Sequence, residues 1–275
     1  MIITCDCQKT KARLLALKQY LTTKVLGTDF VCSYYGECRS SHTETFYEGQ
    51  LHHLGQCYDL LFDDLPLRVV VVGQEYGHSP PRVDCQARYN MIMSSGLDRR
   101  FKAGNGYKAR NPHMRGTTNV LRLLFGIPLG FGHDSEFMMV GGKHIHIFDS
   151  FALVNYLLCS ATSTDGKMRG LATQTMMKNC QGHFRETMCI LHPSVVVVQG
   201  KTFWTWVRAA FDTVIQETDH VYRAKLGSTE TFETVFAHPS SRSPHNWGAN
   251  NHTPYLLETV APSIAHIHQQ LRIVL

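Results

Sequence analysis

Polar side chains that could act on a ligand occur in three short segments, each at the end of an apolar, β-rich run. Gly73–Gly77 follows the first run, and its glycines permit a tight turn and the close approach of a ligand to the backbone. The third segment begins at His238 and offers an imidazole, hydroxyls that suit phosphate oxygens and a guanidinium. Between them in the chain, Asn155 is an amide in an apolar setting, and a buried amide needs hydrogen-bond partners. The candidate residues are Gly73, Gln74, Glu75, Tyr76, Gly77, Asn155, His238, Ser240, Ser241 and Arg242.

Each of these segments also has a purely structural explanation. Gly73–Gly77 can be a strand-to-helix turn, His238 can cap a strand, and Asn155 can satisfy a neighbouring backbone group. All three segments lie at the ends of β-rich runs, and this position favours a ligand-binding site, because ligands of open parallel sheets bind beyond the carboxyl ends of the strands.

The β-rich runs that position these residues are separated by helical segments. The runs cover residues 67–73, 145–156, 194–200 and 232–238, and the first and third are continuous valine stretches typical of strands buried on both faces. Helices are expected at about residues 9–23, 117–125, 171–191, 201–216 and 254–271, with a kink or restart at Pro262. The alternation predicts an α/β fold, a three-layer α/β/α sandwich with a central four-stranded parallel sheet. We expect one domain over residues 1–275, with an N-terminal helical extension at about residues 1–30.

The composition indicates a globular protein inside the cell. The 275 residues are 43% hydrophobic and 18% charged, with no apolar run long enough to span a bilayer and no signal-peptide pattern. We therefore expect no membrane partner and a cytoplasmic location. The formal charge of +5 is compatible with a phosphate-rich partner but also with an ordinary solvated surface.

Nine cysteines are present, an odd number that argues against a disulfide framework in a reducing compartment. The cysteines can instead be buried thiols, metal ligands or the ligands of an iron–sulfur cluster. Cys5 and Cys7 could form a separate metal site, although a frayed terminus explains them as well, and we interpret Cys57, Cys85 and Cys189 as ordinary thiols.

The order of these motifs resembles that of the uracil-DNA glycosylase superfamily over roughly residues 30–257. Gly73-Gln74-Glu75-Tyr76-Gly77 looks like its first active-site motif, and His238-Pro239-Ser240 matches the start of its second. Residues 151–159 resemble the strand that carries the uracil-reading Asn, followed by a Cys. Pro112–Gly116 resembles a segment of the thermophilic iron–sulfur branch, in which a Phe at the position of His113 stacks on uracil.

The resemblance implies a DNA repair enzyme that flips uracil, or a related deaminated base, out of DNA and hydrolyses its N-glycosidic bond. Asn155 would then read the base, His238 would hydrogen-bond the departing uracil, and Glu75 or Gln74 would position water. Ser240, Ser241 and Arg242 would contact phosphates. Tyr76 stands where the family usually has Pro, which marks a divergent member, and Phe101 or Tyr107 could stack on the base instead of His113.

The resemblance also implies a metal site. Cys32 and Cys38 precede the first strand with five residues between them, and Cys159 and Cys180 follow Asn155. This order matches the cysteines that hold a [4Fe–4S] cluster in the iron–sulfur branch, and zinc is the alternative metal for four thiolates.

Two other functions stay open at this point. The chain could be a catalytically weak binder of abasic or damaged DNA on the same fold, which the departures at Tyr76 and His113 suggest. It could also be a nucleotide- or flavin-binding α/β protein, although His238-Pro239-Ser240 argues against that interpretation. In the glycosylase interpretation the partner is DNA and the protein acts as a monomer.

Overall fold

Valine-rich strands form the centre of the fold. The computed structural model describes residues 2–75, 82–97, 106–132, 134–162 and 171–274. Strands β6 (Val69–Gly73) and β11 (Val195–Gln199) are buried along their whole length. Their side chains alternate between two apolar clusters, with Val70 and Val72 in one and Val69 and Val71 in the other. Burial on both faces explains why these strands are almost entirely valine.

The prediction of a central four-stranded parallel sheet is wrong, because the sheet has seven strands and is mixed. Its order is β12-β13-β14-β11-β6-β9-β3. The neighbours β14, β11, β6 and β9 run parallel, whereas β12, β13 and β3 join by antiparallel pairing. The additional strands are β12 (Thr213–Gln216), β13 (Val221–Leu226) and β3 (His53–Leu54), alongside β14 (Thr229–Phe236) and β9 (Phe151–Asn155).

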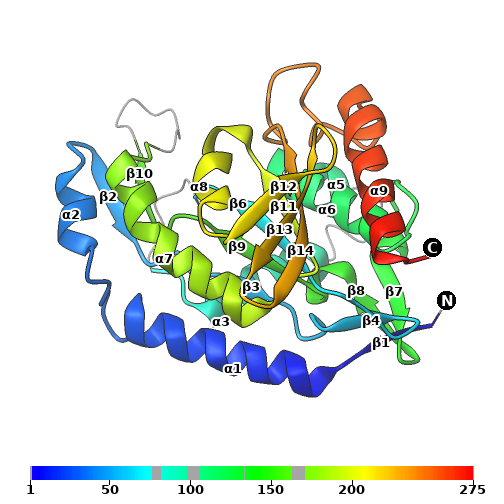
Figure 1. Cartoon of the computed structure of the whole chain (residues 1–275), viewed down its shortest axis with the longest axis horizontal. Helices are drawn as coiled ribbons and strands as arrows, with labels where there is room; N and C mark the ends of the chain where they lie inside the picture. The colour runs from blue at the N-terminus through cyan, green and yellow to red at the C-terminus, as the bar shows by residue number, and fades with distance from the viewer. Residues whose placement is uncertain (1, 76–81, 98–105, 133, 163–170, 275) are drawn as a thin grey trace.

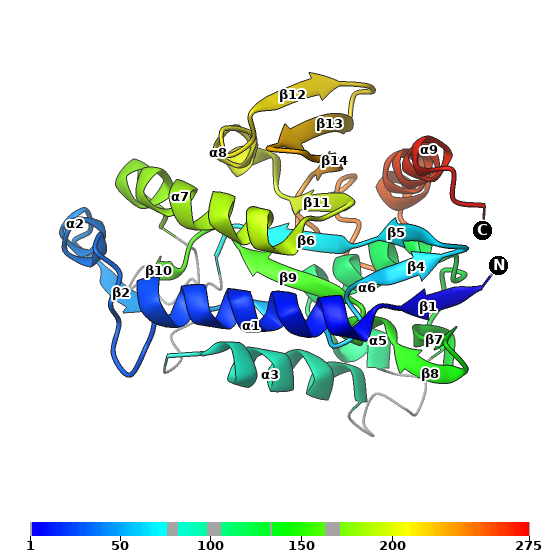
Figure 2. The same ribbon diagram turned by 60° about the horizontal axis from the view of Figure 1, so that its bottom comes forward.

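Helices cover both faces of this sheet, so the class is α/β. On one face, α1 (Cys7–Lys24) runs alongside α7 (Gln174–Leu191), and α8 (Trp204–Arg208) packs against α7 (Figures 1 and 2). On the other face, α6 (Pro112–Leu124) packs against α9 (Ala261–Leu271). Three further helices are α2 (Tyr35–Ser40), which packs against α7, α3 (Cys85–Leu97) and α5 (Gly106–Ala109).

Smaller sheets and turns surround the main sheet. Strands β1, β4 and β5 form a three-stranded sheet, and β10 with β2 and β7 with β8 form two-stranded ones. Their bounds are β1 Ile3–Cys5, β2 Thr45–Glu48, β4 Leu60–Phe62, β5 Leu65–Leu67, β7 Phe137–Val140, β8 Lys143–His146 and β10 Cys159–Thr162. Single 3-10 turns lie at Asp134–Glu136, Ile147–Asp149 and Lys201–Phe203. No helix in the described ranges is long and apolar enough to cross a membrane.

Local signals explain where the main helices start and end. Helix α6 begins at Pro112 because Asn111 caps it, with its side-chain oxygen 2.9 Å from the backbone nitrogen of Met114. At the C-terminal end of the chain, a π-helical segment (Leu256–Val260) leads into α9, whose first turn contains Pro262. The expected helix at residues 201–216 is wrong in its second half, which forms β12.

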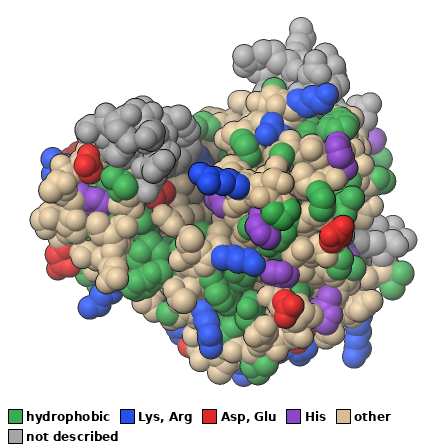
Figure 3. All heavy atoms as spheres, turned by 90° about the horizontal axis from the view of Figure 1, so that it is seen from above, with side chains coloured by type: hydrophobic (Ala, Val, Ile, Leu, Met, Phe, Trp, Pro, Cys, Tyr) green, Lys and Arg blue, Asp and Glu red, His purple; other side chains and the backbone are tan. Residues whose placement is uncertain are grey.

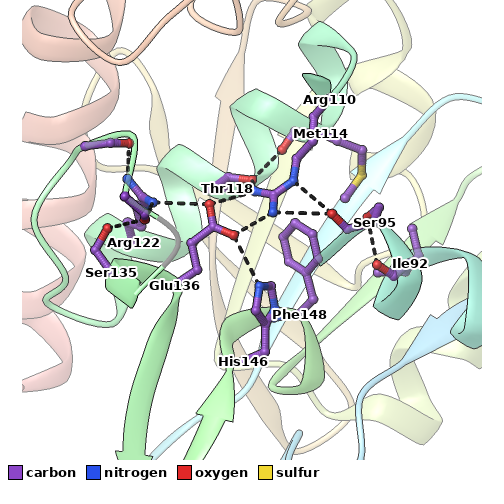
Figure 4. Close-up of polar contacts among 12 residues, drawn as sticks. Ile92, Ser95, Arg110, Met114, Thr118, Arg122, Ser135, Glu136, His146 and Phe148 are labelled. Carbon is purple, nitrogen blue, oxygen red and sulfur yellow. Dashed lines mark hydrogen bonds and ion pairs between the residues drawn. The ribbon is translucent and has the colours of Figure 1, made fainter. Parts of the chain in front are cut away.

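A buried ionic network fixes the segments beneath α6 (Figure 4). The Glu136 carboxylate accepts hydrogen bonds from Arg110 and Arg122 and contacts the His146 imidazole at 3.2 Å. Arg110 also lies over the ring of Phe148. Burial opposes ionisation of Glu136, but the hydrogen bonds from His146 and Arg110 outweigh it and lower its pKa to about 2. The network joins the connection between α5 and α6, α6 itself, the 3-10 turn at residue 136 and β8.

Candidate functional site

Asn155 and Gly73 lie side by side at the carboxyl edge of the parallel strands. They are register partners at the ends of β9 and β6. Asn155 is 5% exposed, and its Nδ2 has no hydrogen-bond partner among the described residues. A buried amide donor without a partner costs free energy, so the position is suited to a ligand that supplies an acceptor.

His113, in the first turn of α6, covers this strand end. Its Nε2 would lie 3.1 Å from a Cβ atom placed on Gly73, so any larger residue at position 73 would press on the imidazole. Burial is the main cause that lowers the pKa of His113 to about 3, and His238 and Arg88 lower it further. The ring is therefore neutral at physiological pH and can present a flat, uncharged face to a ligand.

His238, two residues after the end of β14, faces His113 across the site. The two ring centroids are 5.9 Å apart. The Nδ1 atom of His238 accepts the backbone N–H of Ser240 at 3.2 Å and lies 2.8 Å from the Ser240 hydroxyl. Desolvation lowers the pKa of His238, so the ring is neutral at pH 7 and carries its proton on Nε2. This tautomer makes Nε2–H a hydrogen-bond donor.

Glu75 supplies a carboxylate two residues beyond Gly73. Its Oε1 accepts a hydrogen bond from the Gln74 side chain at 3.0 Å, and its buried Oε2 has no partner among the described residues. Burial raises the pKa of Glu75 to about 7, although the hydrogen bond from Gln74 and the nearby Ala161 and Ser160 oppose that rise. Glu75 can therefore exchange a proton near neutral pH. Its neighbours Tyr76 and Gly77, and the alternative stacking residue Phe101, lie outside the described residues.

The loop after β14 is held against α6 by close packing. A Cβ atom on Gly116 would lie 2.8 Å from the Pro239 ring, so a glycine is needed for this approach. The Trp247 indole donates to the Ala237 carbonyl at 2.6 Å, and the Arg115 Nε donates to the Gly248 carbonyl at 2.6 Å. These contacts bring the loop that carries His238 to the helix that carries His113.

The remaining predicted site residues lie on the surface or in the core. Ser240 and Arg242 are exposed on the loop after β14, and the backbone N–H of Ser241 donates to the His238 carbonyl at 2.8 Å. Tyr107 is 1% exposed, and its hydroxyl accepts a hydrogen bond from Asn119 at 2.8 Å. Its ring is therefore part of the core and is not available to stack on a ligand.

The predicted [4Fe–4S] cluster is wrong. Cys32, Cys38, Cys159 and Cys180 line one cavity, but its volume of about 10 Å³ is only about the space of one water molecule. Burial raises the pKa of each thiol, in Cys180 to about 12, so all four are neutral thiols in the described structure. No group of three or more His, Cys, Asp or Glu in the described ranges could hold a metal ion. These four cysteines instead pack within or against the apolar cluster on the α7 face.

Gln199 is a site neighbour that the sequence interpretation missed. It ends β11, is fully buried, and has an Oε1 atom without a partner among the described residues. The sequence pattern that marked Asn155 as a site residue also applies to Gln199. Each is a polar residue at the carboxyl end of an apolar strand.

The Asn155 amide at the end of β9 therefore lies beside Gly73 and His113, His238 faces His113, and Glu75, two residues beyond Gly73, adds a carboxyl group with a pKa near neutrality. Such a set can read the polar edge of a planar ring, donate a hydrogen bond to a departing anion and hold a water molecule. No protein-family model and no curated protein matches this sequence.

Proposed function

We propose that this chain is a monofunctional DNA glycosylase that releases uracil, or a related deaminated base, and leaves an abasic site. The observation that carries the proposal is the unpartnered, buried amide of Asn155 beside Gly73 and His113. The target base would have to leave the duplex to reach this strand end.

Asn155 suits the polar edge of uracil. Its Nδ2 can donate to a carbonyl of the base while its Oδ1 accepts the ring N–H. Cytosine carries an exocyclic amine in place of that carbonyl and would leave the amide donor unpaired. A buried unpaired donor costs about 1–3 kcal/mol, which is enough for substantial discrimination between the two bases.

His238 and Glu75 suit the bond-breaking step. As the glycosidic bond breaks, negative charge grows on the uracil and positive charge on the sugar. The Nε2–H of His238 is fixed as a donor by Ser240, so it can stabilise the uracil anion without reorganising. The Glu75 carboxylate can hold the attacking water and favour the cationic sugar. The water oxygen then forms the new bond to the sugar carbon, so no lysine is required as the nucleophile.

The surface around the loop after β14 suits the phosphates of DNA. Figure 3 shows Lys, Arg and His side chains spread across the face seen from above. The exposed Ser240 and Arg242 side chains adjoin His238, and the whole chain has a formal charge of +5. These groups would hold the backbone while the strand ends receive the base.

The test is base release from labelled duplexes carrying uracil, hypoxanthine or xanthine, at enzyme excess. We expect an intact abasic strand that breaks only after alkali treatment. Asn155→Ala should lose release while Asn90→Ala, in α3, should retain it. Binding to abasic DNA without release of any of the three bases would reject the enzymatic proposal and favour a DNA-binding role.

A further inference from the structure

Strand β12 is the open edge of the main sheet. Among the residues that the structure describes it pairs only with β13, whereas β3, at the other edge, packs against α3. Figure 2 shows β12 at the outer margin of the sheet, with no described element beyond it. Monomeric proteins usually guard such an edge with charged residues or proline, because its unpaired backbone groups recruit another strand. β12 contains no charged residue and no proline, so its edge is unguarded.

The pairing with β13 shows which backbone groups of β12 point outward. The backbone N–H of Glu217 donates to the Val221 carbonyl at 2.9 Å, in the register of the two strands, so Glu217 bonds toward β13. Residues of an antiparallel pair alternate between those bonded to the partner strand and those whose backbone groups point away from it. Ile215, two residues earlier, therefore also bonds toward β13. The N–H and C=O groups of Val214 and Gln216 point away from the sheet.

The side chains of β12 offer a different surface on each face of the sheet. Successive side chains of a strand point to opposite faces, so Ile215 faces away from Val214. Ile215 is 63% exposed and is the most exposed large apolar side chain in the described strands. Val214 is half-buried and, with Arg208 and Phe211, lines a surface hollow of about 370 Å³ between β12 and α8.

We propose that two copies of this chain associate through β12, paired antiparallel about a two-fold axis that passes between Ile215 and Ile215 of the second copy. Such a symmetric interface sets one patch against its own copy. Val214 of each copy then lies opposite Gln216 of the other, so their outward N–H and C=O groups bond across the axis. The two Ile215 side chains cover each other. The proposal does not rest on the glycosylase function, and it departs from the monomer that the family resemblance implies.

The polar side chains next to the axis fit this register. Glu217 of one copy lies opposite Thr213 of the other, so its carboxylate meets a hydroxyl that can donate a hydrogen bond. Because the axis is perpendicular to the sheet, helix α8 of both copies lies on the same face. Gln216 of one copy therefore adjoins the hollow beside Val214 of the other. Either neighbouring register, with Val214 or Gln216 opposite itself, would set Ile215 against Thr213 or Glu217 and lose the apolar contact.

Sedimentation velocity of the full chain over about a hundredfold range of concentration tests the association, because dimer formation follows mass action. We expect the average mass to rise from the monomer value of 31.1 kDa toward twice that value as the concentration increases. Ile215→Lys should weaken the association about tenfold or more, since it removes the apolar contact and sets like charges against each other. Leu15→Lys is the matched control, at a similarly exposed apolar position on α1, and should associate as the wild type does.

Two further changes distinguish this interface from any other. Gln216→Pro removes an outward N–H without removing a bond to β13, so it should keep the urea-unfolding stability of the wild type and lose the dimer. Ile215→Cys places two thiols at the axis, where the Cα atoms of such a pair are about 4.5 Å apart, within the range of a disulfide. It should give a cross-linked dimer on oxidation, above the wild-type level, and Gln216→Cys should not.

Two results would overturn the proposal. One is a wild-type chain that stays monomeric over the whole concentration range. The other is a dimer that persists in both Ile215→Lys and Gln216→Pro, because the copies would then associate through a different surface.

Discussion

The side-chain amide of Gln199 donates a hydrogen bond to the hydroxyl of Thr117, 3.2 Å away. That hydroxyl donates in turn to the backbone carbonyl of His113 at 3.1 Å. The end of β11 is thereby tied to the turn of α6 that holds the imidazole over Gly73. Gln199 acts on the proposed site through another residue and is a positioning residue.

We predict that Gln199→Leu slows base release by about twofold to twelvefold, as expected for loss of one hydrogen bond worth about 0.5–1.5 kcal/mol. Thr117→Val removes the same bond from the other side. If the bond matters through its effect on His113, the double variant should be no slower than the slower single variant. Additive losses in single-turnover rate would show that the two residues act separately.

His238→Ala should reduce the single-turnover rate of base release by about 100-fold to 1,000-fold, because it removes a fixed donor to the departing uracil. Affinity for uracil-containing DNA should change little. His245→Ala is the matched control, since His245 is an exposed histidine on the same loop. Equal rates for the two variants would remove His238 from the chemical step.

Glu75 should impose a pH dependence on base release. Because burial raises its pKa to about 7, the carboxylate needed to hold water forms only as the pH rises through that value. The wild-type single-turnover rate should therefore increase from acid to neutral pH and then level off, and Glu75→Gln should be slow with a flat profile. A wild-type profile that is flat across this range would contradict the assignment and leave Gln74 as the candidate.

Glu233 should make the fold less stable at alkaline pH. Its carboxyl group is fully buried in β14 without a hydrogen-bond partner among the described residues, and burial raises its pKa from 4.5 to about 8. The folded chain therefore binds this proton more tightly than the unfolded chain does. Its contribution to stability is complete below about pH 4.5 and is lost as the pH rises through about 8.

Urea unfolding at about pH 5 and about pH 9 measures this effect. Glu233→Gln should reduce the loss of unfolding free energy between the two pH values, because the amide cannot ionise. Glu230→Gln, an exposed position on the same strand, is the control and should behave as the wild type does. An unchanged pH dependence in Glu233→Gln would show that another group titrates.

The central strands could be predicted from the sequence because burial on both faces demands continuous valine. The added strands could not. All four residues of β12 are at least partly exposed, and β3 has only two residues, so neither carries a buried-strand pattern. Whether such a segment forms a strand depends on the strand with which it pairs. That pairing arises only in the folded chain, so the local sequence does not show it.

The candidate site was partly predictable for the same physical reason. The carboxyl ends of parallel strands meet at one edge, so Gly73, Asn155 and His238 could be expected near one another from their positions after the apolar runs. The state of Cys32, Cys38, Cys159 and Cys180 could not be expected from spacing. Burial decides whether a thiol stays neutral, and the volume between the sulfurs decides whether a metal cluster has room. Tertiary packing sets both, so neither can be predicted from the spacing of the cysteines.

The buried network around Glu136 constrains how this chain can change over generations. Replacing Glu136 alone would leave the Arg110 and Arg122 guanidiniums, each 1% exposed or less, without their carboxylate, a loss of about 3–5 kcal/mol. Replacing either arginine alone removes one cationic partner of the buried Glu136 carboxylate and is also destabilising. Apolar residues of similar volume at all three positions would be tolerated, but every single-step path to them passes through a damaged protein. Related chains should therefore keep these three residues or exchange them as a set.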